Sequence, residues 1–181
     1  MLSGIVTISS TSVPAPFPAE VLLRGLAALV PAAVDGVLGD LCLAAPGGIA
    51  GLPDIAAQAG CRLAEENDCA SAIAAAISRA RYDTILVLAM GRAPAAGFHR
   101  EIDERMRAGV QKLLMRDEPD GFLQRLFPPL APVALVAGPR QSLRCPQAKP
   151  GRELAALARN LGPASTLNAK AIIIRADAAQ H

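Results

Sequence analysis

Short apolar runs alternate with stretches of helical periodicity through the first two-thirds of this chain. The strand-like runs are residues 4–8, 38–43, 61–65 and 84–88, and the helix-like stretches are residues 19–30, 52–59, 69–80 and 96–108. Strands that alternate with helices favour a mostly parallel sheet with helices on both faces. The pattern therefore predicts an α/β fold.

The boundaries and faces of these elements follow from individual residues. Pro31 is expected to end the helix over 19–30, and Gly60 to close the helix over 52–59. Asp68 is expected to cap the helix that follows it. The run over 84–88 is apolar without interruption, so it predicts a central strand buried on both faces. In the helix over 96–108, the charged residues are expected to face water and His99 to lie at the surface.

The last third of the chain continues in shorter elements. Strands are predicted over 110–115, 133–137 and 171–174, a helical turn over 121–126 and a helix over 152–161. With 181 residues and no linker that would split it, the chain predicts one domain. We expect that domain to cover residues 1–181.

Composition and charge narrow the classes of function. A hydrophobic content of 52% with 19% charged residues is typical of a globular protein and excludes a disordered one. Aromatic residues make up only 3%, which argues against stacking platforms for sugars or bases. The net charge of +2 does not indicate a nucleic-acid or membrane surface. We expect no nucleic-acid partner and no membrane span, because no apolar stretch reaches the ~18 residues that a span needs.

The cysteines and the first residues bear on the compartment. Cys42, Cys61, Cys69 and Cys145 show no C-x-x-C spacing, so we interpret them as reduced structural thiols. Residues 1–4 carry no basic stretch of the kind that begins a signal peptide. These features predict a cytoplasmic protein.

Several segments, spread over about residues 1–105, follow one another in an order and spacing that a known family shares. They are residues 5–8 with the polar loop after them, 23–36, 54–62, 70–80, 82–88 and the residues Gly97, Phe98, Glu101 and Ile102. In this order the sequence resembles the family 2 glycosyltransferases. The resemblance implies a single GT-A-like, Rossmann-like domain of the nucleotide-diphospho-sugar transferase type. It also implies that residues 1–108 form a nucleotide-binding-type half and residues 109–181 a reduced acceptor-side half.

The sequence departs from this family where the family carries its acids. The fourth strand would end in a D-x-D-like pair that holds a divalent metal against a diphosphate, but residues 89–92 read Ala-Met-Gly-Arg. The second strand would end in an acidic turn, but residues 44–48 read Ala-Ala-Pro-Gly-Gly. Hard cations prefer oxygen ligands, which these side chains do not offer. We therefore assign no catalytic residue, no metal ligand and no metal cofactor.

Ligands of parallel sheets bind outside the carboxyl ends of the strands, which points to the loops over 9–17, 45–51 and 89–96. One interpretation is a metal-free anion pocket in which loop amides and hydroxyls bind phosphate and an arginine replaces the metal charge. Its candidate residues are Ser9, Ser10, Thr11, Gly47, Gly48 and Arg92. The alternative is that the glycines form a turn, the hydroxyls are solvated and Arg92 pairs with a neighbour.

Three functions remain open. The first is a glycosyltransferase-like pseudoenzyme without metal-dependent sugar transfer, acting as a binding or partner-interaction domain. The second is an active, metal-independent glycosyltransferase that uses a nucleotide-sugar donor. The third is a nucleotidyltransferase-type enzyme, which shares the sheet but would want basic residues after the first strand, and residues 9–18 carry none.

An apolar cluster in the last third suggests a contact surface. Phe122, Leu123, Leu126, Phe127 and Leu130 are too hydrophobic for a free loop. We expect them either to pack under the sheet or to contact a protein partner or a second copy, with Phe122, Leu126 and Phe127 at the interface.

Overall fold

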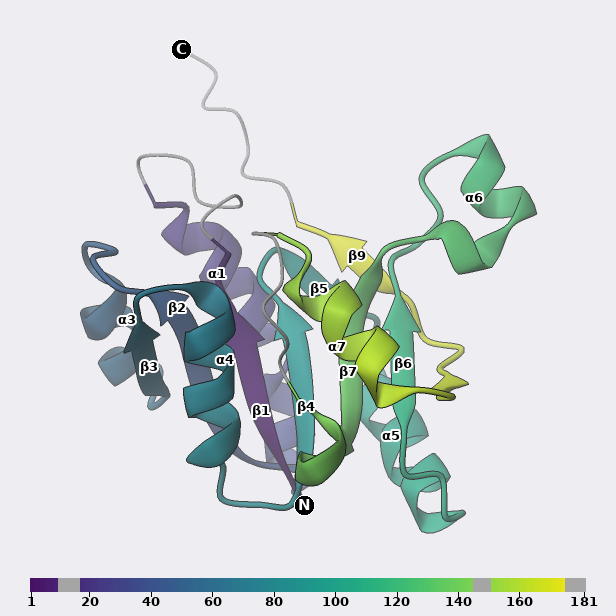
Figure 1. Ribbon diagram of the computed structural model, residues 1–181, viewed down its shortest axis with the longest axis horizontal. Coiled ribbons are helices and arrows are strands. Elements are labelled where there is room, and N and C mark those ends of the chain that lie inside the picture. The colour runs from purple at the N-terminus through teal and green to yellow at the C-terminus, as the bar shows by residue number, and fades with distance from the viewer. Residues whose placement is uncertain (10–16, 145–150, 175–181) are drawn as a thin grey trace.

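The computed structural model describes residues 1–9, 17–144 and 151–174, with the elements labelled in Figure 1. The strands are β1 (Leu2–Thr7), β2 (Leu38–Pro46), β3 (Arg62–Glu66), β4 (Thr84–Ala89), β5 (Arg92–Pro94), β6 (Leu113–Arg116), β7 (Val133–Pro139), β8 (Ser165–Thr166) and β9 (Ala171–Ile173). The helices are α1 (Ala19–Ala27), α2 (Val30–Val34), α3 (Leu52–Gln58), α4 (Cys69–Ser78), α5 (Phe98–Arg107), α6 (Phe122–Leu126), α7 (Glu153–Leu161) and the 3-10 turns η2 (Pro128–Leu130) and η3 (Arg140–Ser142). None of the helices in the described ranges has the length and apolar character that crossing a bilayer requires.

Seven strands form one mostly parallel sheet in the order β3-β2-β1-β4-β7-β6-β8. The first four strands are parallel to one another. β7 runs antiparallel to both β4 and β6, and β8 is parallel to β6. A separate ribbon pairs β5 with β9 in antiparallel register. The predicted α/β architecture is therefore confirmed, with an antiparallel strand inserted beside β4.

Helices cover both faces of the sheet (Figure 1). The helices α4 and α7 pack with β-strand side chains on one face, while α1, α2, α3 and α5 pack on the other. The sequence of β4 is apolar throughout because its side chains pack on both faces. Ile85 and Val87 lie in the core under α4 and α7, and Leu86 and Leu88 lie in the core under α1, α2, α3 and α5. The prediction of a central strand buried on both faces is confirmed.

Two of the predicted helix boundaries are confirmed and one is wrong. Asp68 caps α4 by accepting a 2.8 Å hydrogen bond from the backbone N–H of Ser71, and this bond lowers the pKa of the Asp68 carboxyl. Gly60 follows α3 with a positive φ of 66°. Pro31, however, does not end the helical region: it lies in the first turn of α2, where a proline costs no helical hydrogen bond.

Tyr82 fastens the edge of the sheet where the parallel strands begin. Its backbone N–H donates to Ser3 Oγ at 2.9 Å, and its hydroxyl lies 3.3 Å from Met1 Sδ. The ring packs against Gly39 so closely that a methyl group there would overlap Tyr82 Cε2. Gly39 is therefore the residue that lets the ring lie against β2.

Gly4, in the middle of β1, allows a test of side-chain packing between the neighbouring strands β1 and β2. A methyl group on Gly4 would lie 2.7 Å from Leu41 Cδ1 and 2.8 Å from Leu38 Cδ1. Because both are buried or half-buried core side chains, Gly4→Ala should lower the free energy of unfolding by about 1–3 kcal/mol. Urea denaturation followed by circular dichroism measures this loss. Gly121→Ala is the matched control, since open space surrounds Gly121 and its φ is −136°; an equal loss in both variants would contradict the explanation.

Candidate functional site at the carboxyl edge of the sheet

The fold brings the ends of β1, β2 and β4 to one edge, with β1 in the middle. Their last residues are tied together by the backbone: Ile8 N–H donates to Ala44 O at 2.8 Å, and Met90 N–H donates to Thr7 O at 2.9 Å. The edge is therefore a fixed frame from which three turns depart. These are the turns that the sequence singled out.

The turn after β1 is described only at its start. Ser9 is buried, with 8% of its surface exposed. Ser10 and Thr11 lie outside the described residues. A role for these three hydroxyl groups in binding a substrate stays a prediction.

The turn after β2 contains the two candidate glycines in different settings. Gly47 N–H donates to Glu66 O at 2.8 Å and so continues the pairing of β2 with β3. Gly48 has a φ of 87° and faces open space. Of this pair, Gly48 presents backbone toward solvent while the N–H of Gly47 is already engaged. Neither position carries a side chain that could hold a cation.

The turn after β4 contains a buried ion pair. Arg92 Nε lies 2.7 Å from Asp117 Oδ1 and 2.9 Å from Oδ2. The Asp117 side chain is 1% exposed and that of Arg92 is 25% exposed. Burial raises the pKa of the Asp117 carboxyl, and the Arg92 guanidinium opposes this rise. The expectation that Arg92 pairs with a neighbour is thus met, while its part in substrate binding stays a prediction.

Asp117 is a site residue that sequence reasoning missed. The stretch over 117–120 has the composition of a solvated turn. Asp117 is nevertheless buried beside Arg92, and its backbone forms an isolated β-bridge with Ala171. The signal that would have found it is an acid near the end of a strand-like run. That signal identifies a buried acid only when its partner Arg92, 25 positions away in the sequence, is known.

The ribbon of β5 and β9 lies across the end of β4. Arg92 pairs with Ile173 and Pro94 with Ala171, and Ile174 N–H donates to Gly91 O at 2.9 Å. Gly91 has a φ of 78°, which a glycine adopts readily. The chain's own last described strand therefore occupies the position next to the strand end where the resemblance would place a metal.

Glu101 on α5 holds the segment that leads into β9. Its carboxylate accepts hydrogen bonds from the backbone N–H groups of Asn168 at 2.7 Å and Ala169 at 2.9 Å, and from Arg105 at 2.8 Å. Burial opposes ionisation, but these hydrogen bonds outweigh it and lower the pKa of Glu101. The prediction that Glu101 and Arg105 face water is wrong, because the chain returns over this side of α5.

His99 is likewise buried, so its predicted place at the surface is wrong. It is 4% exposed, its Nε2 lies 2.9 Å from Asp35 Oδ2, and its ring meets Phe98 edge-on with centroids 5.6 Å apart. The partner carboxylate follows α2, which packs near α5, and this contact explains the burial. The Asp35 side chain is 44% exposed, so only the carboxylate of this pair is open to solvent.

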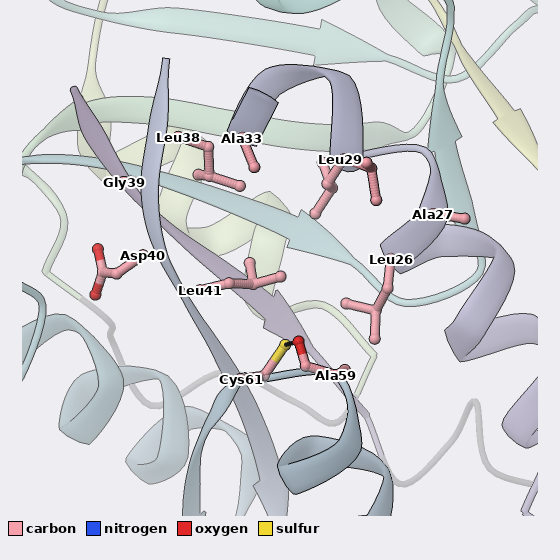
Figure 2. A pocket seen from close by; sticks show the side chains of 12 residues that line it. Leu26, Ala27, Leu29, Ala33, Leu38, Gly39, Asp40, Leu41, Ala59 and Cys61 are labelled. Carbon is pink, nitrogen blue, oxygen red and sulfur yellow. Dashed lines mark hydrogen bonds between the residues drawn. The ribbon is translucent and has the colours of Figure 1, made fainter. Parts of the chain in front are cut away.

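An apolar pocket of about 370 Å³ lies on the α1–α3 side of the sheet, at the start of β2 rather than at the carboxyl edge. Figure 2 shows Leu26, Leu29, Leu38 and Leu41 converging on it, while the Asp40 side chain points away. Asp40 instead forms an ion pair with Arg62. The pocket therefore offers shape and apolar surface, and its thiol, that of Cys61, donates to Ala59 O at 3.7 Å.

The apolar cluster of the last third is exposed. Phe122 is 78% exposed, Leu126 59% and Phe127 54%, and α6 buries none of its residues. Figure 1 shows α6 standing away from the sheet on the side of the carboxyl edge. The alternative that these residues pack under the sheet is wrong, and their role in an interface stays a prediction.

The described residues contain no group of three or more His, Cys, Asp or Glu side chains placed to share a metal ion. Cys42 and Cys69 are buried and Cys61 is half-buried, and none of these three is in a disulfide. Burial raises the pKa of the Cys42 and Cys61 thiols, which disfavours the thiolate needed for metal binding or nucleophilic attack. These residues fit the structural role predicted for them.

Comparison with solved structures finds the same fold in a glycosyltransferase. Glucosyl-3-phosphoglycerate synthase from Mycobacterium tuberculosis, solved with Mn²⁺, uridine diphosphate (UDP) and glucosyl-3-phosphoglycerate, matches with a TM-score of 0.64 and 15% identity over 97% of this chain and 71% of the synthase chain. The same synthase with UDP matches with a TM-score of 0.61 and 14% identity over 97% of this chain and 71% of that one. A structure described as a mycobacterial protein matches with a TM-score of 0.59 and 16% identity over 96% of this chain and 65% of that one.

These matches confirm the predicted GT-A glycosyltransferase-like fold, and at this identity they show the fold alone. No protein-family model matches the sequence, and comparison with curated proteins finds no similar one.

The Arg92–Asp117 pair can be tested by its pH dependence. Arg92→Met leaves a buried carboxylate without its counter-charge and should cost about 3 kcal/mol of unfolding free energy at pH 7. Without the guanidinium the folded-state pKa of Asp117 rises further above its unfolded value. The variant is then most stable when Asp117 is protonated and loses stability as pH rises through that pKa. Urea unfolding at pH 4 and pH 7 measures the difference.

The control for this pair is the double variant Arg92→Met/Asp117→Asn, which removes both charges. It should recover most of the lost stability at pH 7 and lose the pH dependence. A double variant no more stable than Arg92→Met would contradict the role assigned to the pair.

The hydrogen bonds that Glu101 accepts predict the opposite dependence of stability on pH. Glu101→Gln should lower the unfolding free energy at pH 7 by about 1–3 kcal/mol, since hydrogen bonds to an ionised group are lost. Because the folded-state pKa of Glu101 is lowered, the stability it contributes is present above its unfolded pKa and disappears as pH falls through the folded one. The wild-type and variant should therefore converge in acid. Glu104→Gln, at an exposed position of the same helix, should leave the pH profile unchanged.

Proposed function

We propose that this protein uses a glycosyltransferase-like fold to bind a protein partner, and that it does not transfer sugars with the help of a divalent metal. The observation that carries the proposal is the Arg92–Asp117 pair at the end of β4. Metal-dependent transfer needs free oxygen ligands at such a position to hold a cation against a diphosphate. Here the acid beside the strand end already has a fixed cation from the chain.

The electrostatics of the pair oppose replacement of Arg92 by a metal. Both oxygens of Asp117 face Arg92 Nε, and the carboxyl is 1% exposed. To ligate an ion, Asp117 would have to leave the guanidinium and reach an open surface. Breaking a buried charge pair is strongly unfavourable. The β5–β9 ribbon adds a second obstacle, because it must move as well.

The binding role is supported by the surface that the last third of the chain presents. We call the exposed side chains of Phe122, Leu123, Leu126, Phe127 and Leu130 the apolar knob. All five are more than half exposed. Contiguous apolar surface of several hundred Å² is uncommon on proteins that act alone and marks sites of interaction.

A second candidate is metal-independent binding of a nucleotide-sugar at the carboxyl edge. It is favoured by one observation: within the described ranges, the terminal nitrogens of Arg92 make no hydrogen bond, and the side chain is 25% exposed. Asp117 would then orient Arg92 so that its free N–H groups bind a phosphate. A solved structure of similar fold contains UDP. Active sugar transfer without metal would build on the same contact.

Calorimetric titration with UDP-glucose and GDP-mannose, with and without manganese, tests these proposals. The leading proposal expects no binding that manganese strengthens. The second candidate expects binding that is indifferent to manganese and to a chelator and that falls about tenfold or more in Arg92→Met. Micromolar binding that manganese tightens would contradict both, because it would require a metal site.

A further inference from the structure

The apolar knob belongs to a larger surface that contains a hollow. Between the knob and β9 lies a cavity of about 320 Å³, lined by Glu118, Pro119, Asp120, Arg125, Ile172 and Ile173. Ile172 is 54% exposed and Ile173 37%. The helix α6, which carries three of the knob residues, stands out from the body of the molecule (Figure 1). A convex apolar region therefore adjoins a hollow whose walls are mainly polar, with Ile172 and Ile173 on its β9 side.

The knob is short of stabilising contacts within the described chain. α6 has five residues, and none of them is buried. Helices of this length do not persist in water by their own hydrogen bonds, and in proteins they depend on packing of an apolar face. The face that α6 would pack is the one that points outward. A covering partner would supply the missing contacts.

The exposed area suits a protein interface of ordinary size. An aromatic side chain carries about 150–250 Å² and a Leu or Ile roughly 180 Å², so the knob with Ile172 and Ile173 exposes on the order of 700 Å². A standard interface buries about 800 Å² on each partner. The surface is thus large enough to hold two proteins together.

The charges around the hollow are of both signs. Glu118 and Arg125 line it together, both are exposed, and within the described ranges neither side chain forms an ion pair. A two-fold axis brings residue i of one copy to residue j of the other and j to i. Such an axis through this surface would set Arg125 of each copy against Glu118 of the other, while each knob packs on Ile172 and Ile173 at the opposite hollow.

We propose that a second copy of this chain covers the apolar knob, so that two copies form a symmetric dimer by exchanging knob and hollow. The inference rests on the proposed binding function and names its partner. Self-complementarity of shape and charge, on a surface of adequate area, favours a second copy over an unrelated protein.

Sedimentation velocity and light scattering from about 1 to 200 µM test the dimer. The wild-type should have twice the mass of the chain. Phe122→Asp and Leu126→Asp should each weaken the dimer by about 100-fold or more, with unchanged circular dichroism, because both side chains are exposed and their removal leaves no internal cavity. Val34→Asp is the matched control: Val34 is 78% exposed on α2, outside this surface, so the dimer should persist.

A charge exchange tests the two-fold arrangement itself. Arg125→Glu and Glu118→Arg should each weaken the dimer, and the variant carrying both changes should regain it. A double variant weaker than either single one would overturn the exchange of knob and hollow.

A wild-type chain that stays monomeric at 200 µM, or a dimer unaffected by Phe122→Asp and Leu126→Asp, would overturn the second-copy inference. Neither outcome bears on metal-dependent transfer, which the sugar titration decides separately.

Discussion

The ion pair between Arg92 and Asp117 fixes how the segment after β4 packs against the segment after β6. It joins the strand that follows β4 to the residue that follows β6, at the point where Asp117 also bridges to Ala171. A carboxylate that is 1% exposed would be very unfavourable without a counter-charge, so the pair constrains all three segments at once. The parallel half of the sheet and the returning last strand are held in one arrangement by this charge.

The returning segment is fastened mainly by polar contacts. Glu101 holds Asn168 and Ala169 through their backbone N–H groups, and β9 then pairs with β5. Because anchoring falls to carboxylates and backbone hydrogen bonds, Ile172 and Ile173 are left half exposed. The strand β9 that lies next to the end of β4 thus also presents Ile172 and Ile173 to solvent. It therefore links the strand end without acids to the proposed interface.

The sequence allowed much of the fold to be predicted, because its signals are local. Uninterrupted apolar runs mark strands buried on both faces, and Asp68 and Gly60 mark helix ends through their own backbone preferences. The site was harder, since its contacts join distant residues. Arg92 and Asp117 are 25 positions apart, and Glu101 and Asn168 are 67 apart. Hydrophobic periodicity carries no information on such pairs, so charged residues on a helix face were expected in water.

The packing of Tyr82 on Gly39 has a consequence for spectroscopy. The chain has a single tyrosine and no tryptophan, so its intrinsic ultraviolet fluorescence arises chiefly from this one ring. The ring lies where β1, β2 and β4 begin, at the edge opposite to the turns that follow them. Emission from Tyr82 will therefore report on unfolding of the strand starts, while a ligand bound at the carboxyl edge will not contact this ring.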